Sequence, residues 1–384
     1  MKVIKAAIIG SGFIGKQHIE AIRRIPGTTV AALVDTDPEL GKKVCEELSI
    51  PHFYKDYKEM LEKEQPDVVH NCTPNYLHYE ICKEVINAKK HIYCEKPLAN
   101  TSKETRELCR LVKENGVIAG VNFNYRQNAI VKEMRERVKD FQNGCGKVFL
   151  VHGHYLQDWM MYDTDYNWRC IPRLNGPSRT IADIGSHWFD IVQYITGHKI
   201  VRVFADMETV LKQRKKNVVS GKTFEVVASE NYEMVDISNE DIAFIIIEFD
   251  NGIKGQLTLS QVSGGHKNDL CVEIDGSNYS MMWTQENPDK LQIGSRTEGN
   301  ITRYAGPEML SGNAIPYGTL PSGHGLGWND AFKNGILEFY KSIRDKTETE
   351  YATFDDGDYI IRIIEACLKS AKEKKWIEVE TREM

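Results

Sequence analysis

The sequence predicts an α/β protein with two domains. Residues 1–124 form a doubly wound domain with a parallel sheet, and residues 125–384 form an α+β domain with a large, mainly antiparallel sheet. The length of 384 residues suits two domains at about 150 residues each. In the first domain, short apolar runs alternate with helix-length amphipathic segments, which is typical of parallel strands joined by helical crossovers. In the second, strand-like runs follow one another without such helices, which favours antiparallel pairing.

The elements of the first domain follow from this alternation. We expect strands at residues 3–9, 29–34, 68–71, 91–94 and 117–121. Helices should begin near residues 14, 38, 57, 76 and 101. A helix over residues 127–141 then leads into the second domain.

In the second domain, the strands end at turn signals, and Asp250-Asn251-Gly252 is a favourable hairpin turn. The expected strands are 148–155, 201–210, 242–249, 255–263, 269–274 and 279–283, and the closing helices are 328–344 and 355–372. Residues 211–240 are charged and poor in large apolar side chains, which suggests a solvated hairpin excursion.

Composition excludes whole classes of partner. The formal net charge is −6, with 49 basic against 55 acidic residues, so the basic excess that nucleic-acid binding requires is absent. Apolar runs fall far short of the about 20 residues of a membrane span, and the N-terminus runs into a strand without a signal peptide. Nine scattered cysteines without a C-x-x-C pair indicate reduced, buried thiols. We therefore expect a soluble, cytoplasmic protein that binds neither nucleic acid nor membrane.

A glycine-rich loop is the first chemical signal. Gly10-Ser11-Gly12-Phe13-Ile14-Gly15 follows an apolar strand and opens a helix, and Asp35 ends the next strand. Gly10 permits the tight turn, Gly12 lets the backbone approach a pyrophosphate at the helix N-terminus, and Gly15 allows close packing of helix and strand. Asp35 would accept hydrogen bonds from the adenosine ribose and repel a 2′-phosphate. The pattern predicts NAD as the cofactor, with NADP less favoured, over the alternative of a structural glycine turn.

Two further motifs follow neighbouring strands of the predicted sheet. Cys72-Thr73-Pro74-Asn75 leads to His78 after one strand, and Glu95-Lys96-Pro97 follows the next. The carboxyl edge of an open parallel sheet forms the binding crevice, so these residues should meet the ligand. The ammonium of Lys96 could reach a carbonyl or alcohol oxygen, although a surface lysine before a proline is an equally good interpretation of this tetrapeptide alone.

Together with Asp183-Ile184-Gly185-Ser186-His187, these motifs resemble those of the Gfo/Idh/MocA family of sugar and polyol dehydrogenases, and the resemblance covers nearly the whole chain. It implies a Rossmann domain followed by the α+β domain. It also implies that Lys96, Asp183 and His187 are the catalytic residues. The cofactor-binding residues implied are Gly10, Gly12, Phe13, Ile14, Gly15, Asp35, Thr73, Pro74, Asn75, His78, Glu95, Lys96 and Asn124.

The chemistry of Asp183 and His187 also makes sense without the resemblance. His187 lies on an amphipathic helix, and Asp183 precedes it by one turn. Oxidation of a secondary alcohol needs a base for the hydroxyl proton, and an imidazole suits that role. Lys96 would stabilise the developing alkoxide, while Asp183 would contact the substrate or tune the neighbouring charges. The alternative is a helix-capping Asp183 and a histidine packed in the core.

A polar and aromatic segment at residues 155–169 suits a neutral sugar, because carboxylates and amides pair with hydroxyls while aromatic faces cover C–H surfaces. An acidic substrate would instead call for an arginine cluster. The segment resembles one in a subset of the family that acts on neutral, cyclic or anhydro sugars, and Ser260-Gln261-Val262-Ser263 and Gly323-His324-Gly325 fit the same subset. The substrate-binding residues expected are Lys96, Tyr125, Gln157, Trp159, Trp168, Arg169, Asp183, His187 and His324. His152 and His154 alternate along one strand, but nothing else has ligand spacing, so we expect no metal.

The sequence thus predicts an NAD-dependent dehydrogenase that oxidises a secondary hydroxyl of a sugar, anhydro sugar or cyclic polyol. Two alternatives stay open: an NAD-retaining enzyme that cleaves glycosides through transient oxidation, and a non-catalytic ligand-sensing regulator. Residues 242–247 are apolar on both strand faces, and helices of the domain can cover only one. We therefore expect a homodimer or homotetramer that assembles through the C-terminal sheet, as the resemblance also implies.

Overall fold

The computed structural model describes residues 3–217, 232–346 and 350–381. The chain forms two compact units, Met1–Asn124 with Asn329–Tyr359 and Tyr125–Trp328 with Ile360–Met384. This differs from the expected second domain of 125–384, because residues 329–359 belong to the first unit. The reason is aromatic packing, since Phe332 lies edge-on to His18, and Phe339 packs against Tyr93.

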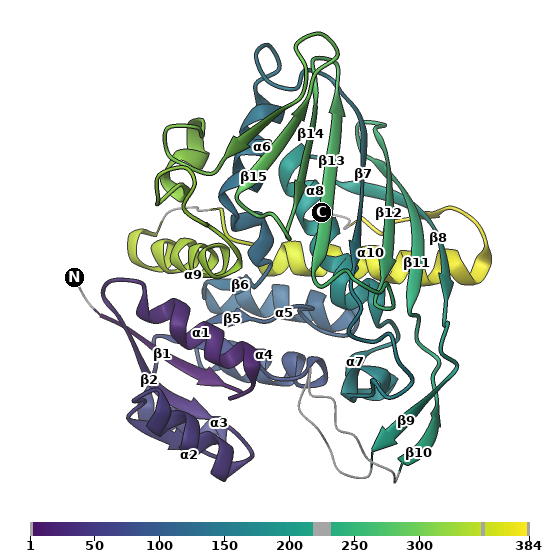
Figure 1. The fold of residues 1–384 in the computed structure, drawn as a ribbon. Helices are drawn as coiled ribbons and strands as arrows, with labels where there is room; N and C mark the ends of the chain where they lie inside the picture. The colour runs from purple at the N-terminus through teal and green to yellow at the C-terminus, as the bar shows by residue number, and fades with distance from the viewer. Residues whose placement is uncertain (1–2, 218–231, 347–349, 382–384) are drawn as a thin grey trace. The chain divides into compact units, whose positions relative to one another are not determined.

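The first unit contains a six-stranded parallel sheet in the order β3-β2-β1-β4-β5-β6 (Figure 1), which confirms the doubly wound fold. Its strands are β1 (Ile4–Ile9), β2 (Thr28–Val34), β3 (His52–Tyr54), β4 (Val68–Asn71), β5 (His91–Cys94) and β6 (Ala119–Val121). Its helices are α1 (Phe13–Arg23), α2 (Pro38–Glu47), α3 (Tyr57–Glu64), α4 (His78–Asn87), α5 (Ser102–Asn115) and most of α9 (Trp328–Asp345), with the short 3-10 turn η1 (Asn75–Leu77). The 3-10 turn η2 (Asn124–Gln127) begins at Asn124, the last residue of this segment, and continues into the second unit. The edge strand β3 was not expected, because three residues are too few for a periodic signal.

The second unit contains a nine-stranded sheet in the order β16-β15-β14-β13-β7-β12-β11-β8-β17. Neighbours pair antiparallel except β12 and β7, which are parallel. The expected α+β domain is confirmed, and the hairpin at Gly252 joins β11 to β12. Its strands are β7 (Val148–Leu156), β8 (Ile200–Glu208), β11 (Ile242–Phe249), β12 (Lys254–Ser260), β13 (Asp269–Gly276), β14 (Ser280–Thr284), β15 (Lys290–Gly294), β16 (Ile301–Tyr304) and β17 (Ile377–Glu378). Its helical elements are α6 (Ala129–Lys139), η3 (Trp168–Cys170), α7 (Pro172–Asn175), η4 (Ile181–Gly185), α8 (Ser186–Thr196), η5 (Gly312–Tyr317) and most of α10 (Phe354–Glu373).

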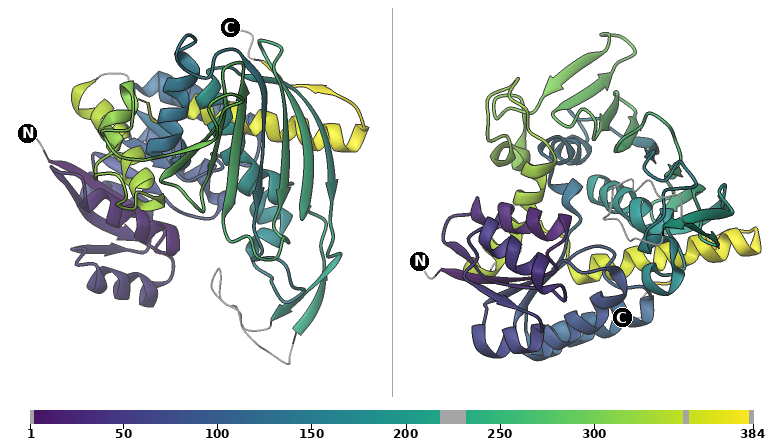
Figure 2. Two further views of the ribbon diagram at one scale, coloured as in Figure 1. Left: turned by 45° about the horizontal axis from the view of Figure 1, so that its top comes forward. Right: turned by 60° about the horizontal axis from the view of Figure 1, so that its bottom comes forward.

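Helices cover one face of the large sheet. In Figure 2, α6 and α8 lie against the same face, and Ala243, Ile245 and Ile247 of β11 are buried on that side. On the other face, Phe244 is 54% exposed and Ile246 is 44% exposed. The expectation that helices cover only one face of this strand agrees with these exposures.

The charged excursion forms a two-stranded antiparallel ribbon of β9 (Gln213–Asn217) and β10 (Tyr232–Asp236), and residues 218–231 of the predicted hairpin lie outside the described residues. The ribbon is not wholly solvated, because Arg214 is fully buried and forms an ion pair with Asp241. Within the ranges that the structure describes, none of the helices combines the length and apolar character needed to span a membrane. All nine cysteines are buried thiols that form no disulfide within the described residues.

Candidate active site

The loop between β1 and α1 is shaped by its three glycines. Gly10 has a φ of 102°, and a Cβ there would lie 2.6 Å from the carbonyl oxygen of Cys72. A Cβ on Gly15 would lie 2.0 Å from the carbonyl oxygen of Gly10. Gly12, by contrast, has open space on its Cβ side, and it is the N-cap of α1 with no side-chain cap. The first turn of α1 therefore presents a positive dipole end without a side-chain cap, which fits the pyrophosphate of NAD.

Asp35 follows β2 and closes this loop from the side. Its Oδ2 accepts a hydrogen bond from the backbone N–H of Ser11 at 2.8 Å and another from the Ser11 hydroxyl. Its Oδ1 accepts from the N–H of Asp37 at 2.9 Å. A carboxylate has about four acceptor positions, so these three bonds leave one position for a ribose hydroxyl. Beside the loop, Phe13 is exposed on the first turn of α1.

His78 bridges the two loops that follow β4 and β5. Its Nδ1 lies 2.7 Å from the carbonyl oxygen of Pro97, and its Nε2 lies 2.8 Å from that of Thr73. The ring is fully buried, and burial lowers its pKa. His78 therefore holds the backbone of both loops at the carboxyl edge of the sheet.

Glu95 and Lys96 stand at the end of β5. The Glu95 side chain turns into the unit, where Oε1 accepts hydrogen bonds from Asn122 Nδ2 at 2.6 Å and from His18 Nε2 at 2.9 Å. Its Oε2 accepts from the backbone N–H of Lys96 at 3.2 Å, while the Lys96 side chain is half-buried. Asn124 is buried just beyond β6. The first unit thus gathers the predicted cofactor residues at one edge of its sheet.

In the second unit, Asp183 lies in the single turn of π-helix η4, and His187 lies in the first turn of α8. The extra residue of a π-turn often marks a functional position. Gln261, fully buried, donates its Nε2–H to Asp183 Oδ2 at 2.9 Å. Arg169 Nε lies 3.7 Å from the same oxygen. Both neighbours can only donate toward this oxygen, so the arrangement favours the ionised form of Asp183.

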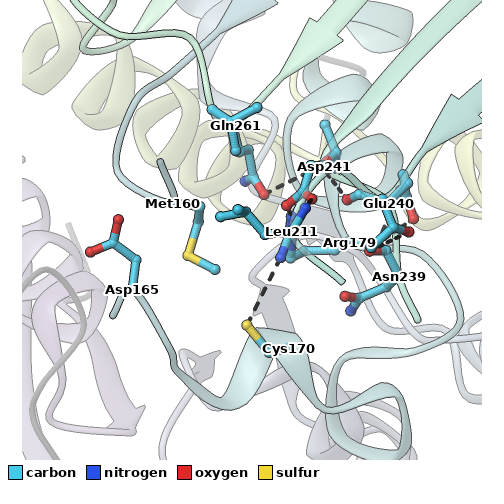
Figure 3. Close-up of polar contacts among 12 residues, drawn as sticks. Met160, Asp165, Cys170, Arg179, Leu211, Asn239, Glu240, Asp241 and Gln261 are labelled. Atoms are coloured by element: carbon cyan, nitrogen blue, oxygen red, sulfur yellow. Dashed lines mark hydrogen bonds and ion pairs between the residues drawn. The ribbon is translucent and has the colours of Figure 1, made fainter. Parts of the chain in front are cut away.

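A buried carboxylate caps η4 at its start (Figure 3). Glu240 accepts hydrogen bonds from the Ser178 hydroxyl at 2.6 Å and from the backbone N–H groups of Arg179 at 3.1 Å and Ile181 at 2.9 Å. An anion at a helix N-terminus satisfies free N–H groups and complements the dipole. Glu240 therefore fixes the start of the turn that carries Asp183.

The neighbouring Asp241 joins two buried arginines, and Figure 3 shows its contact with Arg179. Arg214 also donates to Asp241, at 2.8 Å, and to the carbonyl oxygens of Tyr162 at 2.8 Å and Asp165 at 3.0 Å. Burial works to raise the pKa of Asp241, but the two guanidinium groups outweigh it and lower the pKa. This ion cluster ties the turn bearing Asp183 to the polar and aromatic segment.

That segment is organised around Asn268. Its Oδ1 accepts from the hydroxyl of Tyr155 at 2.6 Å and from Gln157 Nε2 at 3.0 Å, and its Nδ2 donates to the Tyr125 hydroxyl at 2.9 Å. Trp159 donates its indole N–H to Gln157 Oε1 at 2.8 Å. Burial raises the pKa of both tyrosines, which keeps both phenols protonated at neutral pH.

Aromatic rings complete this group. The ring of Tyr125 lies edge-on to that of His187, with centroids 4.7 Å apart. The guanidinium of Arg169 lies 4.5 Å from the Trp168 ring centroid and 5.6 Å from that of Trp159. Seven of the predicted substrate residues thus form one connected set in this unit: Tyr125, Gln157, Trp159, Trp168, Arg169, Asp183 and His187.

His324 does not share these contacts. It is exposed, and its Nδ1 lies 3.0 Å from the carbonyl oxygen of Pro321 in its own loop. Conversely, Gln261 and Asn268 contact the predicted site residues but were not among them. Gln261 gave a signal as a polar residue directly after an apolar strand, whereas Asn268 lies in a polar turn that looks like any other.

His152 and His154 lie on the exposed face of the large sheet. Within the described ranges, His152, Glu273 and Asp275 are the one group of three ligand-type side chains close enough to share an ion. All three are partly exposed, and His152 Nε2 lies 3.3 Å from Asp275 Oδ2. An exposed ion pair accounts for this cluster.

A parallel sheet with an open glycine loop, carried in one chain with an α+β unit, defines an NAD-binding oxidoreductase. The chain belongs to the Gfo/Idh/MocA oxidoreductase family. The family's NAD-binding Rossmann-fold model matches residues 4–123, and its C-terminal alpha/beta domain model matches residues 141–379.

Named relatives span the full chain. Levoglucosan dehydrogenase of Pseudarthrobacter phenanthrenivorans is 27% identical, over 99% of this chain and 99% of the relative. Myo-inositol 2-dehydrogenase of Thermotoga maritima is 23% identical, over 98% of this chain and 99% of the relative. The solved structure of a levoglucosan dehydrogenase in complex with NADH and levoglucosan has a TM-score of 0.88 at 25% identity, covering 99% of this chain and 100% of that chain. The predicted family is therefore confirmed.

Proposed function

We propose that this protein is an NAD-dependent dehydrogenase that transfers a hydride between a secondary hydroxyl of a neutral sugar, anhydro sugar or cyclic polyol and the nicotinamide. The observation that carries the substrate class is the Arg169–Asp183 pair beside the indoles of Trp159 and Trp168. Such a set pairs with vicinal hydroxyls and covers the C–H face of a ring. Relatives named for levoglucosan and myo-inositol support the same class.

NAD would be held by the first unit. The open N-terminus of α1 suits the pyrophosphate, and Asp35 suits the adenosine ribose while disfavouring NADP. When bound, NAD supplies a nicotinamide that accepts the hydride from the carbinol carbon. The remaining proposed contacts are Phe13, Ile14, Thr73, Pro74, Asn75, His78, Glu95, Lys96 and Asn124, several of which support their loops from within.

In this proposal His187 takes the hydroxyl proton, and the ammonium of Lys96 stabilises the negative charge that develops on the substrate oxygen. Asp183, as a carboxylate, orients a substrate hydroxyl. Tyr125, Gln157, Trp159, Trp168 and Arg169 bind the ring, and His324 is retained as a substrate contact contributed by a loop. No metal ion takes part, since hydride transfer to a nicotinamide needs none.

A panel of sugars and polyols, followed by NADH absorbance, tests the function. Lys96→Ala and His187→Ala should each lower turnover by about two orders of magnitude or more. His154→Ala is the matched control, because its ring lies on the exposed sheet face at 3.0 Å from Asp269. The oxidation rate should rise with pH through the ionisation of His187, and His187→Ala should remove that dependence.

The same assay separates the alternatives. Release of reducing sugar without net NADH would identify a glycoside-cleaving enzyme. Tight NAD binding without turnover on any substrate would indicate a ligand sensor. Full activity of His187→Ala would refute the proposed base and leave Lys96 or Tyr125 as the next candidate.

We further propose that the chain assembles as a homodimer or homotetramer through the open face of the large sheet. Phe244 and Ile246 support this, because adjacent exposed apolar side chains on a strand are costly in water. Light scattering at micromolar concentration should give a multiple of the 43.9 kDa chain mass, and a monomer mass would refute the proposal. The nine buried cysteine thiols support a cytoplasmic location.

A further inference from the structure

A buried chain of polar side chains runs behind Glu95 in the first unit. Tyr340 of α9 has its hydroxyl 2.8 Å from His70 Nε2, and His70 Nδ1 lies 2.8 Å from His18 Nδ1. His18 Nε2 in turn lies 2.9 Å from Glu95 Oε1. Tyr340, His70 and His18 are all 0% exposed, and Glu95 is 7% exposed. Four titratable groups from α9, β4, α1 and the end of β5 are therefore joined without water.

The carboxylate fixes where the protons lie at neutral pH. Because ionised Glu95 can only accept, His18 must carry its proton on Nε2. A neutral His18 then accepts at Nδ1, so His70 must donate from its own Nδ1. His70 is left to accept at Nε2 from the Tyr340 hydroxyl. All three hydrogen bonds therefore point toward Glu95.

The pair can take up one proton and keep three hydrogen bonds, because the bond that Tyr340 donates to His70 is replaced by one that it accepts. His70 passes its Nδ1 proton to His18, which becomes an imidazolium paired with Glu95. The incoming proton resides on His70 Nε2, which now donates to the Tyr340 oxygen. His70 stays neutral in both states, in agreement with a pKa lowered by burial and by the nearby His18.

We propose that His18 and His70 form a buried one-proton switch that acts on Lys96 through Glu95, with His18, His70 and Tyr340 as positioning residues. At neutral pH the negative charge of Glu95 is not cancelled by His18, so it attracts the positive charge of Lys96. Glu95 also accepts a hydrogen bond from the backbone N–H of Lys96. When the switch takes up a proton, the imidazolium cancels that charge. The effect on turnover rests on the proposed role of Lys96, whereas the proton switch itself does not.

The other titratable groups that surround these four side chains do not account for the proposed proton uptake. They comprise Tyr93 beside both imidazole rings, His78, Cys72 and Cys94 around Glu95, and Arg344 near Tyr340. The buried cysteines and Tyr340 have raised pKa values, and His78 has a lowered one. The raised pKa values keep the two thiols and the Tyr340 phenol protonated at neutral pH, and the lowered pKa of His78 favours its neutral form.

Nitrogen NMR on histidine-labelled protein tests the switch directly. At pH 8, His18 should be the Nε2–H tautomer and His70 the Nδ1–H tautomer. On acidification His18 should become an imidazolium while His70 remains neutral and changes to the Nε2–H tautomer. Two histidines that titrate independently, or a His70 that keeps one tautomer throughout, would overturn the proposal whether or not a substrate has been found.

Tyr340→Phe tests the link to turnover with a change that only removes a hydroxyl. The protonated state needs that oxygen as an acceptor for a buried N–H, and unpaired buried donors are tolerated least. The variant should therefore shift proton uptake, and the acid limb of the kcat profile, to lower pH by about half a unit or more, with the KM for NAD unchanged. Tyr351→Phe is the control, since its ring packs on Phe339 and its hydroxyl bonds Ser342 instead.

The outcomes are distinguishable. If the acid limb of the kcat profile shifts in Tyr340→Phe and does not shift in Tyr351→Phe, the result supports the link between the proton switch and turnover. Identical profiles for Tyr340→Phe and the unmodified enzyme would overturn it, and His187 alone would then set the acid limb. Absence of turnover on every substrate refutes the proposed function and leaves the NMR result to decide on the switch.

Discussion

Replacing Gln261 with Met should remove a hydrogen bond that positions Asp183, while the fold stays intact. Gln261 is fully buried after β12, and its Nε2–H donates to Asp183 Oδ2 at 2.9 Å. Its Oε1 lies 3.4 Å from the Thr180 hydroxyl, which donates a shorter bond of 2.7 Å to the Glu240 carbonyl. Met has nearly the same volume and shape, so the change removes mainly one hydrogen bond to a charged group.

The size of the effect follows from that bond. A hydrogen bond to an ionised group contributes about 1.5–3 kcal/mol, and about 1.4 kcal/mol corresponds to a factor of ten in rate. If the substrate hydroxyl is oriented by Asp183, kcat/KM should fall by about 10- to 150-fold. The affinity for NAD should not change, because the glycine loop and Asp35 belong to the other unit.

The assay measures kcat/KM by initial rates with the best sugar, NAD affinity by fluorescence titration, and stability by thermal unfolding. Gln256→Met is the matched control, since this glutamine lies on β12, the strand that leads to Gln261, but is exposed and bonds Thr258. A Gln261→Met enzyme with kcat/KM within about twofold of the unmodified protein would refute the claim that this bond positions Asp183. A fall of equal size in the control would point to a general effect on β12.

Three other outcomes are expected. Asp35→Ser should weaken NAD binding and relieve the repulsion of the NADP 2′-phosphate, and equal affinities of the unmodified protein for both cofactors in fluorescence titration would contradict this role. Trp168→Ala should raise the KM for the sugar by about 5- to 30-fold, because one aromatic face is worth about 1–2 kcal/mol, and an unchanged KM in rate assays would rule out ring stacking there. His70 and His78 have pKa values lowered by burial, so they stabilise the fold above about pH 6.5 and that contribution is lost as the pH falls below it. Calorimetry between pH 8 and 5 should show a falling transition temperature, in contrast to the constant one expected if these rings were exposed.

Local patterns made the first unit predictable. The strand, glycine loop, helix and Asp35 lie within 32 residues, Ile4 to Asp35, and each has a backbone requirement that the sequence displays. Gly10 needs a positive φ, and Gly15 sits against the Gly10 carbonyl. The carboxyl edge then follows from parallel pairing alone, which is why the sequence predicts Thr73 and Lys96 at that edge.

Long-range packing set the limit of prediction. The path of α9 into the first unit depends on Phe332 and Phe339 meeting rings that lie more than 200 positions earlier. Gln261 contacts a residue 78 positions away, and Arg214 lies in a run of charges that looks solvated yet binds Asp241. Apolar periodicity carries no information about the Gln261–Asp183 and Arg214–Asp241 pairs, because both partners are polar and the burial of each depends on the other.

The hydrogen bonds that hold the carboxylates of Glu95 and Asp183 lead to one more conclusion about the proton. Burial works to raise the pKa of Glu95, but the hydrogen bond and charge of His18, with Asn122 and Lys96, outweigh it and lower the pKa. Asp183 likewise faces the donors of Gln261 and Arg169. Neither carboxylate is therefore suited to receive the proton of a substrate alcohol at neutral pH, and each is better suited to supply a fixed charge. Proton transfer then falls to an imidazole, which is the group whose charge changes between pH 5 and 8, and a solvent isotope effect on turnover that survives Asp183→Asn but disappears in His187→Ala would place it at His187.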